Sequence, residues 1–267
     1  MKTSLLRSLL VQLWLPVLLV LVLWVGTIGS TSFYFPPFTS VLSALTDSFT
    51  NGPLGGDLAF SLRNILIGLA IAIVAGVGVG IVIGETRSLR VASQPFLDFM
   101  RATPIVAFVP VVIVAFGVHS GPKIFLIAFG SVWPILLNTV SGVHGISAAV
   151  RDTVQAYRIP VWLRFRKVVL PGAAPQIFAG IRVSLSIAIV MMIVSEIYGS
   201  PQGLGYFIMN SGTNFAVADT WAGTLLIAVL GYLLTLVLIL IEHTSLGWYE
   251  QRAPRRRRAP APDAASA

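Results

Sequence analysis

The chain has 267 residues, of which 56% are hydrophobic and only 10% are charged, whereas a soluble domain usually has about 25% charged residues, so we expect lipid to cover much of its surface. The absence of cysteine excludes a disulfide scaffold, a thiolate metal site and a cysteine nucleophile. The formal net charge of +8 is typical of basic cytoplasmic loops in a polytopic membrane protein and does not indicate nucleic-acid binding, which needs a basic face on a recognisable module.

Six apolar stretches are each long enough to cross a bilayer as a helix, which takes about 17–25 residues. A helix satisfies its own backbone hydrogen bonds in lipid, and none of the stretches alternates like a barrel strand. The first has no A-x-A-like cleavage site, so we expect it to be retained as a span rather than removed as a signal peptide. The pattern predicts an all-α, multi-pass membrane protein with six transmembrane helices. In chain order they cover residues 9–28, 61–84, 96–118, 124–143, 179–199 and 221–241.

The distribution of basic residues predicts the orientation, because loops rich in Lys and Arg stay in the cytoplasm. With both termini cytoplasmic, all of the 18 lysines and arginines except Arg63 and Lys123 fall on the cytoplasmic side. We therefore predict a multi-pass membrane protein with both termini in the cytoplasm. Arg101, at the start of the third span, is expected to form an i,i+3 ion pair with Asp98.

The chain divides into three parts by composition. Residues 1–57 hold the first span and an outside loop rich in Pro, Ser, Thr and Gly, and residues 58–248 form the core. Residues 249–267 form a basic tail that we expect to be disordered near anionic lipid headgroups. Glycines four apart in the second span allow another helix to approach closely, and prolines in the third and fourth spans should kink them. These residues are Gly76, Gly80 and Gly84, and Pro104, Pro110 and Pro134.

The longest internal cytoplasmic loop, residues 144–175, is too polar to be a span and too regular to be a linker. Asp152 followed by Gln155 is a capping pattern, which predicts a short helix starting at Asp152. Pro160 disfavours helix at the residue before it, so this helix should end near Arg158. An amphipathic segment over residues 162–169 then leads back into the membrane. The loop should therefore present a short helix at the cytoplasmic face.

This loop resembles the EAA motif of type I ABC importer permeases. Asp152 stands in the place of the Glu of the motif, and Thr153 and Val154 replace its two alanines. Arg158 falls where the family has Gly. A resemblance to the nitrate, sulfonate and taurine permease branch extends over most of residues 58–248. It is carried by RATPIVAFVPVVIVAFG with FGSVWPILLNTVSGV, by SEIYGSPQGLGYFI and by IEHTSLGW.

The resemblance implies a MetI-like permease fold in the bacterial cytoplasmic (inner) membrane and a loop that docks in a separate ABC ATPase subunit, which binds ATP and Mg. The other implied partners are an extracytoplasmic solute-binding protein, a second permease copy or a paralogue, and membrane lipid. Transport would follow alternating access. The substrate implied is nitrate, a sulfonate, taurine or a similar anion such as bicarbonate, and a vitamin or precursor such as riboflavin or thiamine pyrimidine is the alternative. The residues implied in ATPase coupling are Asp152, Thr153, Val154, Tyr157, Arg158, Pro160, Trp162, Leu170 and Pro171.

The sequence holds no pattern of a catalytic or metal site of its own. No Ser/His/Asp grouping or pair of carboxylates falls at one depth, and His119 and His144 fall on opposite faces of the membrane. No phosphate loop of the type G-x-x-x-x-G-K-[ST] occurs. We therefore expect a transport subunit and not an enzyme, with no cofactor or metal bound by this chain.

Polar residues within the spans are candidates for the transport path. Glu196, near the outer end of the fifth span, either lines the path or holds a neighbouring helix by hydrogen bonds. Asn138 and Ser141 in the fourth span and Ser184 in the fifth either line the path or join helices. The alternative function, a stand-alone secondary transporter or channel, would need coupling carboxylates or a filter within the spans, and only Glu196 qualifies.

Overall fold

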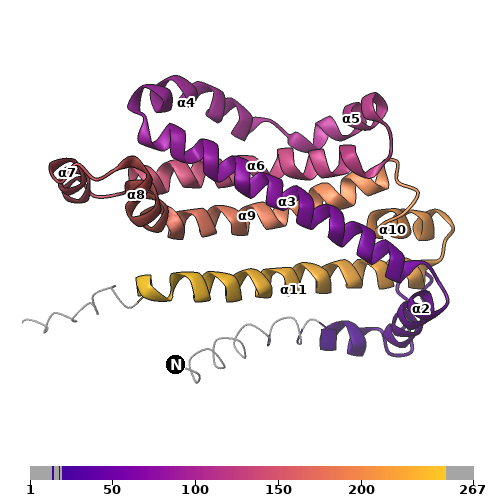
Figure 1. Ribbon diagram of the computed structural model, residues 1–267. Coiled ribbons are helices and arrows are strands. Elements are labelled where there is room, and N and C mark those ends of the chain that lie inside the picture. Colours follow the sequence, from indigo (N-terminus) through magenta and orange to yellow (C-terminus); the bar gives the residue numbers. More distant parts are fainter. Residues whose placement is uncertain (1–13, 15–17, 19, 251–267) are drawn as a thin grey trace, which may run out of the picture.

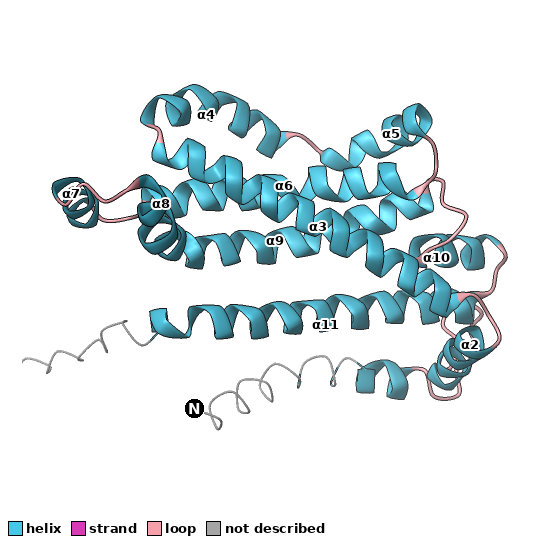
Figure 2. Ribbon diagram, in the orientation of Figure 1, coloured by secondary structure: helices cyan, strands magenta, loops and turns pink. Residues whose placement is uncertain are grey.

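The computed structural model describes Trp14, Leu18 and residues 20–250 of the chain. These residues form helices joined by loops and turns, and they contain no strand (Figure 2). The predicted all-α class is therefore confirmed. The first predicted span, residues 9–28, lies largely outside the described residues, although residues 20–26 are helical. Residues 251–267 of the predicted basic tail also lie outside them.

Four long helices are apolar enough to cross a membrane, and they correspond to the second, fourth, fifth and sixth predicted spans. Each is longer than predicted, because its polar ends continue the helix beyond the apolar stretch. The helix that corresponds to the second predicted span has 32 residues, which reach about 48 Å at 1.5 Å per residue and exceed the roughly 30 Å of the hydrocarbon layer. The four are α3 (Leu54–Glu85), α6 (Ser120–His144), α9 (Leu170–Ile197) and α11 (Val217–Glu250).

The third predicted span, residues 96–118, is broken at Pro104, where a kink was predicted, and is therefore not one continuous helix. It is a bent pair made of α4 (Arg87–Ala102) and of η1 (Ile105–Phe108) with α5 (Val109–Phe116), and the bend is 78°. Pro104 explains the break, because it forces Thr103 into the extended conformation seen there, with φ −77° and ψ 127°. With this pair counted as one span, the described residues contain five candidate spans.

The helices α3, α6 and α9 pack against one another and form the centre of the bundle (Figure 1). Ile65, Leu126 and Met192 are each 0% exposed where these three helices meet. The close approach depends on the predicted glycine face of α3. A Cβ atom on Gly76 would lie 2.9 Å from Cγ2 of Ile135 on α6, so only glycine fits there.

Short helices cover the two ends of the bundle. One end carries α2 (Phe38–Thr50) and α10 (Leu204–Thr213), and the opposite end carries α7 (Ala148–Ala156) and α8 (Val161–Arg164) (Figure 1). A π-helical turn, η2 (Phe165–Val169), joins α8 to α9, so that residues 161–197 form one unbroken helical run. The predicted outside loop before residue 57 thus contains a helix, α2, in addition to its turns.

Candidate functional site

The predicted cytoplasmic helix exists, but it begins earlier than predicted. It is α7, which starts at Ala148 after an extended Ser147 and places Asp152 in its middle. The predicted start at Asp152 is therefore wrong, because Ala148 and Ala149 are strong helix formers and extend the helix toward the N-terminus. The end near Arg158 is confirmed, since the last helical residue is Ala156.

The turn after α7 keeps the backbone geometry of a glycine although its residue is an arginine. Arg158 has φ +49°, in the left-handed region. Its amide donates to the carbonyl of Gln155 at 3.0 Å, and the amide of Ile159 donates to the carbonyl of Val154 at 3.1 Å. These two bonds make a Schellman motif, which usually has Gly at this position and Pro shortly after it, as Pro160 is here.

We call α7, the turn after it and α8 the coupling hairpin (residues 148–164). Its tip exposes large apolar side chains: Tyr157 is 78%, Val161 81% and Trp162 69% exposed. Such a patch at the end of a protein marks an interaction surface. Among the other residues predicted to couple, Asp152 and Thr153 are exposed, whereas Val154 is buried. Leu170 and Pro171 are at the start of α9, beyond the hairpin.

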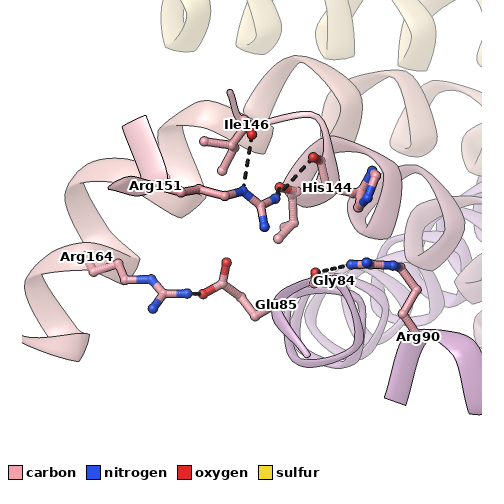
Figure 3. A network of polar contacts seen from close by, with 8 residues as sticks. Gly84, Glu85, Arg90, His144, Ile146, Arg151 and Arg164 are labelled. Atoms are coloured by element: carbon pink, nitrogen blue, oxygen red, sulfur yellow. Dashed lines mark hydrogen bonds and ion pairs between the residues drawn. The ribbon is translucent and has the colours of Figure 1, made fainter. Parts of the chain in front are cut away.

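Charged side chains attach the coupling hairpin to the ends of the spans (Figure 3). Arg151 donates to the last carbonyls around the end of α6, at 2.7 Å to Val143 and 3.1 Å to His144. Arg164 of α8 forms an ion pair with Glu85, the last residue of α3. The hairpin is thus connected to α3 and α6 by side chains and to α9 by the chain itself. Glu85 is not among the residues predicted from the sequence, although a lone acidic residue at the end of a span and next to a basic loop was a signal for it.

A buried polar cluster lies at the opposite end of the bundle, where α10 begins. Glu196 of α9 is 1% exposed. Its carboxylate accepts hydrogen bonds from the Ser61 hydroxyl at 2.8 and 2.9 Å and from the Gly205 amide at 3.0 Å. In this structure Glu196 therefore joins α9 to α3 and to α10.

Asp57 and Ser61 of α3 complete this cluster. The Asp57 carboxylate accepts from the amide of Gly203 at 2.6 Å, and the Ser61 hydroxyl oxygen accepts from the amide of Leu204 at 2.9 Å. The first amides of a helix have no partner within the helix and carry partial positive charge, so carboxylates stabilise them. We call Asp57, Ser61 and Glu196 the α10 clamp. Neither Asp57 nor Ser61 stood out in the sequence, because their partners are more than 140 residues away.

The other candidates for the transport path form hydrogen bonds of two kinds. The Ser184 hydroxyl donates to the Ser131 carbonyl at 2.6 Å, which joins α9 to α6. Asn138 and Ser141 donate to carbonyls of their own helix, at Pro134 and Leu137. Their lining of the path remains a prediction.

The fold is that of a helical protein with several helices apolar enough to cross a membrane, and the part of the chain that the structure describes holds no metal-binding group of His, Cys, Asp or Glu. A family model described as "Binding-protein-dependent transport system inner membrane component" matches residues 57–252. Because this match covers most of the chain, the chain belongs to that family, and the resemblance to ABC importer permeases is confirmed.

Named relatives agree with this assignment. The bicarbonate transport system permease protein CmpB of Synechococcus elongatus is 34% identical over 65% of this chain and 63% of its own. The taurine transport system permease protein TauC of Escherichia coli is 28% identical over 81% of this chain and 80% of its own. The inward-facing MetNI methionine ABC transporter matches the fold with a TM-score of 0.58 and 18% identity, over 70% of this chain and 93% of that one. CmpB and TauC are named as transport permeases, and together with the family match they show that this chain is a transport subunit and not an enzyme.

Proposed function

We propose that this chain is the permease subunit of an ATP-driven importer in which the coupling hairpin docks in a separate ABC ATPase subunit. The observation that carries the proposal is the exposed apolar tip of Tyr157, Val161 and Trp162, because the tip lies at the end of the bundle (Figure 1), beyond the spans that lipid would cover. The ATPase binds ATP and Mg, and its closure pushes the hairpin. Arg151, Arg164 and the continuous helix from α8 to α9 pass this movement to α6, α3 and α9.

The charge distribution supports an orientation in the membrane. The hairpin end carries the basic loops, so we place it in the cytoplasm together with both termini. The end with α2 and α10 then faces outside, where a solute-binding protein delivers the substrate. A second permease, identical or paralogous, completes the path between the two chains. The ATP state drives alternating access because it binds one conformation more tightly than the other.

The names of two relatives support a substrate class. CmpB and TauC are named for bicarbonate and taurine, and both solutes carry an anionic group with several oxygen atoms. We therefore propose that this chain moves a small solute with such a group, for example nitrate, an alkanesulfonate, taurine or bicarbonate.

The test of the docking is co-purification with a candidate ABC ATPase. Trp162→Glu should abolish the association, because a carboxylate replaces an exposed indole that the ATPase groove would bury. Tyr34→Glu is the matched control, since Tyr34 is 71% exposed and lies at the opposite end of the bundle, and it should leave the association unchanged. An ATPase that stays bound to both variants, or uptake that persists without the ATPase, would contradict the proposal.

A further inference from the structure

The break in the third span opens onto a cavity beside the middles of two other spans. The cavity has a volume of about 450 Å³, within the roughly 300–1,000 Å³ of a small-molecule site. It is lined by three groups of residues, from α4 and η1, from the middle of α6, and from α9. They include Arg101, Thr103, Ile105, Trp133, Pro134 and Ser186.

Arg101 brings a positive charge to this cavity. The predicted pair with Asp98 is wrong, because the Asp98 carboxylate accepts from the Gln94 amide at 3.2 and 3.3 Å instead. No carboxylate lies within ion-pair distance of Arg101 among the residues that the structure describes. Arg101 was predicted to lie at the cytoplasmic start of the third span. In the structure Arg101 lines the cavity together with Gly130 and Trp133, which lie in the middle of α6. A charged side chain at that depth is costly and indicates function.

The helix that starts after the break adds positive potential at the same place. It begins at Ile105, and Ile105 and Val106 both line the cavity. The first amides of a helix lack acceptors within it, and they make its N-terminus a site for anions. Half-helices that end inside a membrane present such N-termini to anionic groups of transported solutes.

Trp133 forms an aromatic wall of the cavity. It lines the cavity, and its ring packs edge-on against Phe96 and Phe129. The charged group gathered here is thus the Arg101 guanidinium, whose planar fork suits the paired oxygens of a carboxylate, sulfonate or nitrate group.

The geometry points to this cavity as the anion-binding position of the transport path, with Arg101 as the residue that favours anionic solutes over cationic ones. The inference rests on the proposed function and deepens it by naming the place where the solute is held. The break at Thr103 and Pro104 is then the device that exposes helix-start amides in the middle of the bundle. Glu196, by contrast, stays with the α10 clamp and takes no part in holding the solute.

The chain has no cysteine, which allows a direct measurement of the potential in the cavity. A single cysteine in the variant Thr103→Cys is treated with two thiosulfonate reagents of similar size, one ending in a sulfonate and one in a quaternary ammonium. We expect the rate ratio of the anionic to the cationic reagent to fall about tenfold when Arg101→Gln is added, because one unit charge is removed nearby. Arg87→Gln, at the start of the same helix and away from the cavity, is the matched control and should leave the ratio unchanged.

Uptake by the complete system, with the ATPase and the binding protein in vesicles, gives the second measurement. For the anion that the wild type moves among nitrate, ethanesulfonate, taurine and bicarbonate, Arg101→Gln should lower uptake at least about tenfold, the factor that one lost charge contact is worth. Arg101→Lys should keep part of it, and ATP hydrolysis stimulated by the binding protein should persist in both.

The outcomes separate the two proposals. If the wild type moves none of the four solutes, the substrate class of the proposed function is wrong, and the reagent ratio still decides the role of Arg101. If the wild type is active and Arg101→Gln is equally active, or the reagent ratio does not change, the inference about this cavity is wrong. A cysteine at position 103 that reacts with neither reagent also overturns it, because the cavity would then be closed to solutes.

Discussion

The two ends of the bundle are held together by different kinds of polar contact. In the coupling hairpin, the side chains of the ion pair Arg164 and Glu85 are 41% and 23% exposed. In the α10 clamp, Asp57, Ser61 and Glu196 are 4%, 0% and 1% exposed. An exposed ion pair contributes about 0–1 kcal/mol, whereas leaving a buried donor without its acceptor costs about 1–3 kcal/mol, and more where the acceptor is charged. The hairpin end is thus weakly held and the α10 end strongly held.

This difference teaches how the molecule can be driven from one side. Polar contacts that are partly exposed cost little to break, so the hairpin can change its angle to the spans more easily than α10 can. We expect the strongly held end to move as one piece with α3 and α9, so that a small shift at the hairpin tilts whole helices. Packed helices that move as rigid units are a common means of switching between two states. The following predictions test whether the two ends really differ in this way.

The largest effect on stability should come from Glu196→Ala. The substitution leaves the Gly205 amide and the Ser61 hydroxyl buried without their acceptor, so we expect the free energy of unfolding to fall by about 3 kcal/mol. Denaturant unfolding of the purified chain in detergent measures it. Glu242→Ala is the control, because Glu242 pairs with Arg182 at a more exposed position, and its effect should be below about 1 kcal/mol. Equal effects of the two variants would show that the clamp is no stronger than a surface pair.

A smaller decrease in the free energy of unfolding should follow from Gly203→Ala, which disturbs the clamp without removing any of its polar groups. Gly203 has φ +114°, and a Cβ atom there would lie 2.5 Å from Cδ of Glu196. Overpacking and the unfavourable backbone together should cost about 2 kcal/mol. Gly56→Ala, in the helical α3 with no atom within 4 Å of the added carbon, should be neutral or slightly stabilising. If both variants unfold at the same denaturant concentration, the clamp tolerates a shift that this structure does not allow.

The sequence alone predicted the strongly periodic parts and missed contacts between distant residues. Apolar length identified four of the span helices, and Pro160 located the end of α7 because proline acts on its immediate neighbour. The 78° bend at Pro104 could be predicted as a kink but not in size, since the packing of α4 decides it. Asp57 and Ser61 contact Gly203 and Leu204 only after α3 and α10 have met, and one sequence carries no signal for such a meeting.

A substitution in the turn after α7 should stabilise the coupling hairpin modestly, whereas the substitutions in the α10 clamp destabilise the protein. Arg158 holds a left-handed conformation at φ +49°, which costs a residue with a Cβ about 1 kcal/mol relative to glycine. Arg158→Gly should therefore slow the hydrogen exchange of α7 amides about fivefold, whereas Arg158→Ala, which keeps the Cβ, should not slow it. Faster exchange in the glycine variant would mean that the arginine side chain, and not the backbone, stabilises this turn.

The smallest effect on stability should come from Glu85→Ala, which removes the partner of Arg164. Because the pair is partly exposed, the free energy of unfolding should change by less than about 1 kcal/mol. The amount of solute moved per ATP hydrolysed is the more sensitive measurement, since the ion pair is the side-chain link from α8 to α3. We expect less solute moved per ATP hydrolysed, and the exchanged pair Glu85→Arg with Arg164→Glu should restore part of it. If Glu85→Ala transports with unchanged coupling, the movement of the hairpin reaches the spans through Arg151 and the continuous helix into α9 alone.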